Sequence, residues 1–261
     1  IHSFIFSSVI IFIEKRHWYK RMSTKVLGKK ISYRGSKDLK ILDKIKRSHS
    51  NIKYGIDIWN IYDFLFLDNR NLPILKVLEI SFPITSKYIV ESKSMKLYLN
   101  DFYNKSFNKE SELINIIKND IEKIIQSPIK IKFINKFYNE PNYQNLNTVL
   151  NKKSRANTIL KFNGFRSICP VTAQPDLANI YIYSDKQFSI NWLRDYLTSY
   201  QNQGDFHEQC IESIYTDIKS KFLCSHLEVC GRFQRRGGID INPIRGNKKD
   251  ILFKNFREFN Q

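Results

Sequence analysis

The segment 165–176, FRSICPVTAQPD, holds the residues best suited to covalent chemistry in this chain. Cys169 stands directly before Pro170 in turn-forming sequence, whereas the other cysteines fall in patterns typical of a helix or a strand. A free thiol has a pKa of about 8.5 and becomes a useful nucleophile when its thiolate is stabilised nearby. Asp176 can accept or donate the proton of whatever the sulfur attacks. Spacing alone leaves two interpretations open: a nucleophile with a proton partner, or a turn with a small buried thiol.

The motif DFHEQCIE, 205–212, presents a histidine and a carboxylate at the expected start of a helix. Phe206 and Cys210 belong to the apolar face of that helix, so His207 and Glu208 lie off this face near its N-terminus. A glutamate there also interacts favourably with the helix dipole, which is the structural alternative. Because a carboxylate only accepts hydrogen bonds, Glu208 suits a ring edge with neighbouring N–H donors, such as N1–H and the exocyclic amine of guanine.

The stretch 91–100, ESKSMKLYLN, alternates as a strand would. Glu91 and Lys93 fall on one face of this expected strand, and Ser92 and Lys96 on the other. An exposed edge strand is the structural alternative, because lysine is common on such edges.

The stretch 232–243, RFQRRGGIDINP, is the densest basic motif. Arg235 and Arg236 precede Gly237-Gly238, where the flexible backbone allows close approach of a ligand. Arginine binds phosphate through forked N–H groups, so this pattern suits a phosphate. A solvated basic turn is the alternative.

The elements that must position these residues follow from periodicity. In the first half we expect strands at 73–84 and 87–99, a helix at 110–126 and a strand at 129–137. In the second half we expect a strand at 175–183, a helix capped by Ser189, a helix at 206–222 and a strand at 227–234. Two units of strands, helices and returning strands, without strict β-helix-β alternation, predict an α+β fold with antiparallel sheets.

The flanking and connecting segments carry weaker patterns. The apolar run 4–13 is shorter than the ~20 residues of a membrane span, and its basic residues follow it, whereas a signal peptide carries them in front. We expect residues 1–21 to be an N-terminal extension or a start-site artefact, disordered or loosely docked. The Asn- and Lys-rich segment 139–161 has no sustained periodicity and is expected to be a linker.

Composition narrows the function classes. The chain has 261 residues, 42% of them hydrophobic, which is enough for one large or two modest cores. The net charge of +18 has two explanations: contact with a polynucleotide, or a coding bias toward lysine together with a basic small-molecule site. Neither a dinucleotide-binding glycine motif nor a P-loop occurs. Cys224, His226 and Cys230 would still need a fourth ligand to bind zinc, and four cysteines without C-x-x-C favour a reducing cytoplasm.

Five blocks in order resemble the QueF-type NADPH-dependent 7-cyano-7-deazaguanine reductases, the nitrile reductases of queuosine biosynthesis. They are GIDIWNIYDF (55–64), ESKSMKLYLNDF (91–102), CPVTAQPD (169–176), DFHEQCIE (205–212) and GRFQRRGGIDINPIRGN (231–247). The similarity covers roughly 26–247 and is to the longer, two-module form of the family. It implies tandem tunnelling-fold (T-fold) modules, with antiparallel sheets and helices packed on one face. The modules would be 22–138 and the catalytic 162–261, joined by the linker 139–161.

The resemblance also implies roles for individual residues. Cys169 would attack the nitrile carbon to form a covalent thioimide, and Asp176 and His207 would handle the protons. The deazaguanine would be bound by Glu91, Ser92, His207 and Glu208. The cofactor NADPH, which delivers hydride twice, would be bound by Ser92, Lys93, Lys96, Arg235, Arg236 and Gly237.

As partners, the resemblance implies the small-molecule substrate 7-cyano-7-deazaguanine and a second copy of the chain in a cytoplasmic homodimer. It implies no metal, no direct nucleic-acid contact and no membrane. The sequence departs from the family in its short linker, in QNQG at 201–204 and in residues 1–21. Three alternatives are a nucleobase-binding relative that does not reduce, a basic RNA-binding protein, and a cyclohydrolase of the same fold. The RNA-binding alternative lacks an aromatic recognition motif, and the cyclohydrolase would need zinc ligands beside Cys169.

Overall fold

The computed structural model describes residues 41–47, 51–150 and 152–261, which form two similar runs of strands and helices. The first run consists of β1 (Lys44–Lys46), β2 (Tyr54–Leu67), β3 (Pro73–Pro83), β4 (Tyr88–Val90), α2 (Ser92–Asn100), α3 (Glu110–Ile125) and β5 (Lys130–Ile134). The second consists of β6 (Gln144–Asn145), β7 (Thr158–Ile168), β8 (Pro175–Ser184), α4 (Ile190–Thr198), the 3-10 helix η2 (Ser199–Asn202), α5 (His207–Phe222), β9 (Leu227–Phe233) and β10 (Ile239–Gly246). The predicted extension 1–21 and the start of the predicted first module, 22–40, lie outside the described residues.

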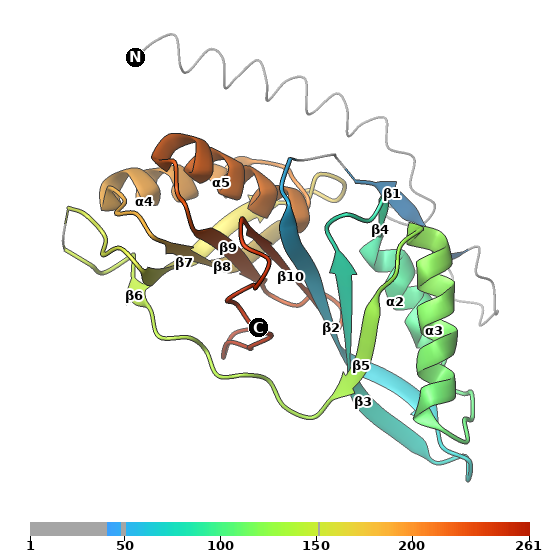
Figure 1. Ribbon diagram of the computed structural model, residues 1–261. Coiled ribbons are helices and arrows are strands. Elements are labelled where there is room, and N and C mark those ends of the chain that lie inside the picture. Colours follow the sequence, from blue (N-terminus) through green and yellow to red (C-terminus); the bar gives the residue numbers. More distant parts are fainter. Residues whose placement is uncertain (1–40, 48–50, 151) are drawn as a thin grey trace.

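The two runs share one eight-stranded sheet, in the order β5-β3-β2-β10-β9-β8-β7-β6 (Figure 1). All neighbouring strands are antiparallel except the short β6, which pairs with β7 in parallel. The junction is the pairing of β2 with β10, where Tyr54 lies opposite Gly246 and Ile61 opposite Ile239. The predicted α+β class with antiparallel strands is therefore confirmed, and the last strand of the second run completes the sheet of the first.

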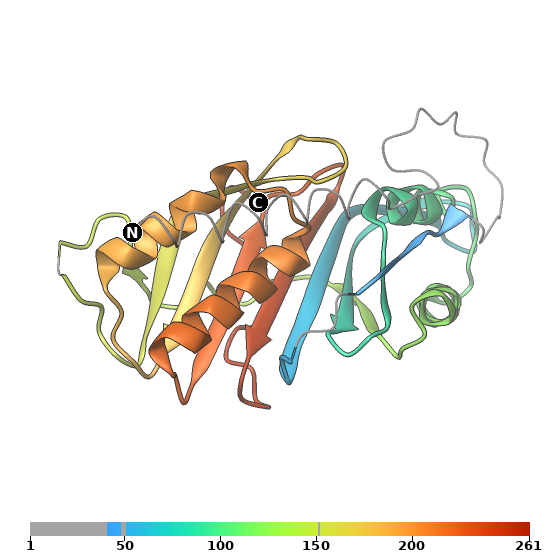
Figure 2. The same ribbon diagram turned by 90° about the horizontal axis from the view of Figure 1, so that it is seen from above.

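The helices α2 and α3 of the first run and α4 and α5 of the second cover the same face of this sheet. Trp59 of β2 lies opposite Ile241 of β10, and Arg245 of β10 lies opposite Val229 of β9. Because residues two or four apart along a strand share a face, all four side chains point to one side. Trp59 and Ile241 belong to the core packed against α2 and α3, and Val229 to the core packed against α4 and α5. Figure 2 shows these helices from above. No helix in the described part of the chain is long and apolar enough to cross a membrane.

The opposite face of the sheet is covered by the C-terminal segment 247–261. Phe253 and Phe256 pack on Ile58, Tyr181 and other residues that point away from the helices. Hydrogen bonds from buried side chains fix the segment, because the amide of Asn255 donates to Glu79 and Asn60 at 2.8 Å each, and the Tyr181 hydroxyl donates to Glu258. The face opposite the helices is therefore filled by the C-terminal segment, as Figure 1 shows below the sheet. The face that carries the helices remains available for a site.

One expected strand is a helix. The segment 87–99 forms only the short β4, and α2 begins at Ser92. Glu91 is the N-cap, because its carboxylate accepts hydrogen bonds from the backbone N–H groups of Lys93 at 2.7 Å and Ser94 at 2.8 Å. Met95, Tyr98 and Leu99 are buried on one side of the helix. The prediction was wrong because spacings of three and four place these residues on one helix face, which outweighs the polar alternation of the first residues.

The remaining predicted elements lie close to their expected positions. The helices expected at 110–126 and 206–222 are α3 and α5, and Ser189 caps α4 by accepting from the Trp192 N–H. The strands expected at 129–137, 175–183 and 227–234 are β5, β8 and β9. The expected linker, 139–161, contains β6 and the first residues of β7, so part of it belongs to the sheet edge.

Candidate active site

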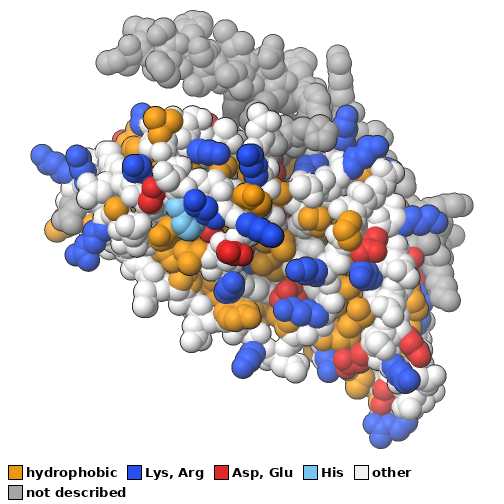
Figure 3. All heavy atoms as spheres, viewed as in Figure 1, with side chains coloured by type: hydrophobic (Ala, Val, Ile, Leu, Met, Phe, Trp, Pro, Cys, Tyr) orange, Lys and Arg blue, Asp and Glu red, His pale blue; other side chains and the backbone are white. Residues whose placement is uncertain are grey.

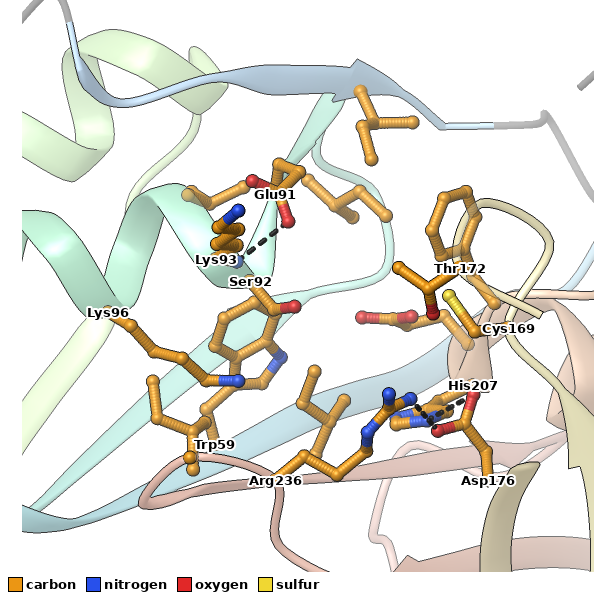
Figure 4. A pocket seen from close by; sticks show the side chains of 18 of the residues that line it. Trp59, Glu91, Ser92, Lys93, Lys96, Cys169, Thr172, Asp176, His207 and Arg236 are labelled. Carbon is orange, nitrogen blue, oxygen red and sulfur yellow. Dashed lines mark hydrogen bonds and ion pairs between the residues drawn. The ribbon is translucent and has the colours of Figure 1, made fainter. Parts of the chain in front are cut away.

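A cavity of about 440 Å3 lies on the helix face of the sheet, where the two halves meet. The first half contributes the start of α2 together with side chains of β1, β2 and β4. The second half contributes the β7–β8 hairpin, the start of α5 and the turn between β9 and β10. Of the eleven residues predicted to contact substrate or cofactor, ten line this cavity: Glu91, Ser92, Lys93, Lys96, Cys169, Asp176, His207, Glu208, Arg236 and Gly237. Figure 4 labels all of these residues except Glu208 and Gly237.

Cys169 stands at the tip of the β7–β8 hairpin and is partly exposed to the cavity. Its backbone N–H donates to the Gln174 carbonyl at 2.8 Å, and its own carbonyl accepts from the Ala173 N–H at 3.0 Å. Ala173 has a φ of 56°, in the left-handed region, which ends the turn and returns the chain into β8. These bonds hold the segment 169–174 as a closed loop and place the thiol and Asp176, the second residue of β8, in the same cavity.

Asp176 is held by two cationic or potentially cationic partners. The guanidinium of Arg236 donates from Nη1 to Oδ1 at 2.5 Å, and His207 Nε2 lies 3.3 Å from Oδ2. Burial alone would raise the pKa of Asp176, but the hydrogen bonds and charges of His207 and Arg236 outweigh it and hold that pKa below its ordinary value. The His207 ring stacks on Phe233 at 4.0 Å between centroids, which fixes its plane. Asp176 is therefore an ionised group beside a histidine, able to take a proton from a nearby thiol.

Glu208 lies in the first turn of α5 and is only 5% exposed. Burial raises the pKa of its carboxyl, and the charge of Asp57 adds to this rise, while His207 and Arg47 oppose it. Glu208 lines the cavity with few groups to compensate its charge. A ligand that donates hydrogen bonds would remove this penalty.

A buried network of four charged side chains lies behind Glu208. Arg245 Nη1 donates to Asp57 at 2.6 Å and Nη2 to Glu212 at 2.9 Å. Arg47 Nη2 donates to the other oxygen of Asp57 at 2.7 Å. The charges of these four side chains balance, and the network joins β2 and β10 to α5 and to the residue following β1. It fixes the start of α5, and with it Glu208, relative to the first half of the molecule.

Glu91 and Ser92 lie across the cavity from the hairpin, at the start of α2 (Figure 4). Burial raises the pKa of Glu91, although the hydrogen bonds that its carboxylate accepts from the N–H groups of Lys93 and Ser94 lower that pKa. Because each carboxylate oxygen accepts one helix N–H, Glu91 is held in place by its capping role and keeps a further lone pair on each oxygen. The cap therefore fixes a second carboxylate at the cavity wall.

The cations of the cavity lie close together. Burial lowers the pKa of Lys96, and the nearby charge of Arg236 lowers it further. Gly237 has a φ of 58°, and a Cβ there would meet the aliphatic part of Lys96 at 3.3 Å, so the glycine leaves room for the lysine. The carboxylates of Glu91, Asp63 and Asp176 oppose this lowering, and a bound anion would act in the same direction as they do. Arg235 does not line this cavity: its guanidinium lies over the ring of Tyr62 at 5.3 Å, because neighbouring side chains in the turn point to different sides.

Sequence reasoning missed two cavity residues with unsatisfied polar atoms. The indole Nε1 of Trp59 and the Thr172 hydroxyl oxygen are buried and have no hydrogen-bond partner among the described residues. The Nδ1 atom of His207 is in the same condition. Trp59 and Thr172 stand inside the quoted blocks 55–64 and 169–176, but burial without a partner is visible only in three dimensions. Unsatisfied buried polar atoms are uncommon, and three in one cavity indicate a polar ligand.

The other cysteines and histidine singled out in the sequence lie elsewhere. Cys210, Cys224 and Cys230 are free and buried, and His226 Nε2 lies 3.1 Å from Glu228. Within the described ranges, no three His, Cys, Asp or Glu side chains are grouped to hold a metal ion.

Comparison with known proteins gives a consistent result for both halves. Residues 32–133 match the family described as "Nitrile reductase, 7-cyano-7-deazaguanine-reductase N-term", and residues 175–251 match the family described as "QueF-like protein". Three curated relatives carry the name NADPH-dependent 7-cyano-7-deazaguanine reductase. The protein of Buchnera aphidicola is 36% identical over 78% of this chain and 87% of its own length. That of Rickettsia prowazekii is 34% identical over 90% and 97%, and that of Acinetobacter baylyi 29% identical over 84% and 92%.

Proposed function

Since this chain belongs to the NADPH-dependent 7-cyano-7-deazaguanine reductase family, we propose that it reduces the nitrile of 7-cyano-7-deazaguanine to an aminomethyl group. The product would be 7-aminomethyl-7-deazaguanine, an intermediate of queuosine biosynthesis for tRNA modification. One observation carries the proposal: a single cavity gathers a thiol, an Asp–His proton pair, two buried carboxylates and three Lys or Arg side chains from sequence blocks far apart in the chain.

Cys169 captures the nitrile as a covalent thioimide. The sulfur forms a bond to the nitrile carbon, one C–N π bond breaks, and its electron pair moves to nitrogen. The thiol proton passes to Asp176 or His207 and then to that nitrogen. The thioimide therefore contains all the atoms of the thiol and the nitrile, and nothing is released. Asp176 is ionised and so has a free site for the thiol proton, and its lowered pKa favours the second half of the step, in which its acid form donates that proton to nitrogen. Addition converts an unreactive triple bond into an imine-like group that accepts hydride.

Glu208 and Glu91 recognise the deazaguanine edge. Each presents carboxylate oxygens that only accept hydrogen bonds, and the guanine-type edge carries adjacent N–H donors. Both carboxylates are nearly inaccessible to solvent, 5% and 1% exposed. A base without those donors would leave Glu208 buried without a partner and Glu91 with its helix bonds alone, so the site discriminates against it. Ser92 and His207 complete the set of base contacts.

NADPH, when bound, supplies hydride to the carbon that Cys169 holds. Lys96 and Arg236 would hold its phosphates, since their mutual repulsion in the cavity is relieved by an anion. Ser92, Lys93 and Gly237 line the same cavity, and the backbone at Gly237 permits close approach.

Each half is proposed to be one T-fold module, 22–138 and 162–261, with 139–161 as the connection. The common helix face and the similar order of elements in the two halves support this division. In the described residues the sheet ends at β5 and β6, whose outer edges suit association with another copy in a homodimer. We propose a cytoplasmic location because all four cysteines are free thiols.

The test is NADPH oxidation, followed by absorbance, on mixing the purified chain with 7-cyano-7-deazaguanine. We expect oxidation only when the base is present, with two NADPH consumed for each nitrile reduced. Binding of the base without oxidation would instead identify a nucleobase-binding relative. Retention of RNA without either would favour the polynucleotide explanation of the charge. Figure 3 shows the basic side chains spread over the visible face among apolar and neutral ones, which does not resemble a continuous nucleic-acid track.

A further inference from the structure

The hydroxyl of Thr172 lies at the end of the cavity that holds the reactive sulfur. Thr172 and Cys169 both line the cavity, and Figure 4 draws them at the same end of it. The Thr172 oxygen is buried and has no hydrogen-bond partner among the described residues. A threonine that served only the hairpin would bond its hydroxyl to a backbone carbonyl of the loop, which is the common local pattern. This hydroxyl is therefore available to a ligand.

The hairpin turn sets the direction of that hydroxyl relative to the sulfur. The Ala173 N–H donates to the Cys169 carbonyl at 3.0 Å, which closes one helical turn over 169–173. In such a turn, side chains three positions apart lie on the same side. Cys169 and Thr172 are three positions apart, so both point from one face of the turn into the cavity. The second loop hydrogen bond, from the Cys169 N–H to Gln174, keeps this geometry fixed.

The chemistry at Cys169 creates a need for a donor at this place. As sulfur adds to a nitrile carbon, negative charge develops on the nitrile nitrogen before a proton arrives. In the free nitrile, the nitrogen lies on the line through the ring carbon and the nitrile carbon. As the sulfur adds, the nitrile carbon becomes trigonal and the nitrogen moves away from the sulfur. Asp176 is ionised and cannot donate a hydrogen bond in that state, and its oxygens already contact Arg236 and His207. A fixed neutral O–H donor is suited to stabilise the developing charge without disturbing the proton pair.

We propose that the Thr172 hydroxyl donates a hydrogen bond to the nitrile nitrogen while Cys169 adds to the carbon, and retains it in the thioimide. This role rests on the proposed function and adds one catalytic residue to it. Thr172 transfers no proton: the proton still moves from the thiol through Asp176 or His207 to nitrogen. The hydroxyl has no partner in the free protein because its partner arrives with the substrate.

The experiment measures thioimide formation without NADPH, so that hydride transfer does not contribute. Wild type, Thr172→Val and Thr172→Ser are mixed with 7-cyano-7-deazaguanine, and the covalent mass adduct is followed over time by mass spectrometry. Valine has the shape of threonine without the donor, and serine keeps the donor. We expect Thr172→Val to form the adduct about 100-fold more slowly, the lower end of the effect of losing one oxyanion-hole donor. Thr172→Ser should form it at nearly the wild-type rate.

Two controls separate this role from a structural one. The first is the rate at which iodoacetamide alkylates Cys169, which should be equal in all three proteins. The second is non-covalent affinity for the base, measured with Cys169→Ala as background, which should also be unchanged by Thr172→Val. An unchanged adduct rate in Thr172→Val refutes the proposal, and so does a parallel loss of alkylation, because it would show a displaced hairpin. If wild type forms no adduct, the proposed covalent mechanism fails instead.

Discussion

Exchange of Glu208 for glutamine should weaken binding of 7-cyano-7-deazaguanine by about 30- to 700-fold. Because Glu208 is only 5% exposed, water does not reach the bound base to accept the hydrogen bond that the lost carboxylate oxygen would have accepted. Glutamine turns one acceptor oxygen into an NH2 group that meets a donor of the base. A hydrogen bond to a charged group contributes about 1.5–3 kcal/mol, and an unpaired buried donor costs about 1–3 kcal/mol. Since glutamine retains one acceptor, we take about 2–4 kcal/mol, and each 1.4 kcal/mol is tenfold in Kd.

The same exchange should stabilise the free protein. Burial and the charge of Asp57 raise the pKa of Glu208 in the fold, so ionising Glu208 costs folding free energy. With a raised folded pKa, stability is full below the unfolded pKa and declines as pH rises through the folded value. Glutamine carries no such penalty, so the Glu208→Gln variant should unfold at higher denaturant concentration than wild type at neutral pH. Base affinity has the opposite dependence: wild type should lose it as pH falls through the raised pKa, and the variant should not.

The measurements are titrations of the base from pH 5 to 8 and denaturant unfolding, both in the Cys169→Ala background. Glu112→Gln is the matched control, because it removes the same charge from an exposed position on α3. Equal affinity of the Glu208→Gln variant and its parent would remove Glu208 from base recognition. A variant that binds weakly and is also less stable would mean that Glu208 supports the fold rather than the ligand.

Three further outcomes follow from the site. Cys169→Ala should abolish both NADPH oxidation and the covalent mass adduct while the base still binds; normal turnover would exclude this nucleophile. Arg236→Met removes a charge that lowers the pKa of Asp176, so the acid limb of the pH profile of kcat/KM for the base, at saturating NADPH, should move to higher pH. An unmoved limb would mean that another group controls it. Arg245→Met leaves the buried carboxylates of Asp57 and Glu212 with Arg47 alone to balance two charges and should lower the free energy of unfolding by about 3–5 kcal/mol in denaturant titrations. A loss below 1 kcal/mol would show that the network is dispensable.

The chemical groups of the site could be predicted because each stands at a position where the sequence pattern gives it no place in an apolar core. Cys169 precedes a proline in a turn, and His207 and Glu208 stand off the apolar face of α5. The helices α3 and α5 were predictable for the complementary reason, since their apolar residues repeat at helical spacing over four turns.

The remaining features depend on contacts between distant segments. The first residues of 91–100 alternate as in a strand, while Met95, Tyr98 and Leu99 have helical spacing, and the capping bonds of Glu91 fix the start of the helix. Arg235 and Arg236 are chemically identical neighbours, yet one packs on Tyr62 and the other binds Asp176, because each points to a different partner in the fold. The orphan hydroxyl of Thr172 cannot be recognised until burial is known.

The division of the site between the two halves follows from strand order. β10 is the last strand of the second run, but it pairs with β2 of the first. This β2–β10 junction therefore lies beneath the cavity rather than at its edge. The charge network places Arg245 of β10 between Asp57 of β2 and Glu212 of α5, so the wall that carries Glu208 is fixed to both halves. Glu91 reaches the same cavity from α2, on the far side of that junction. The proposed recognition of one base by these two carboxylates requires a constant separation between them. Directional ion pairs at the junction hold that separation more precisely than an apolar core of equal stability would.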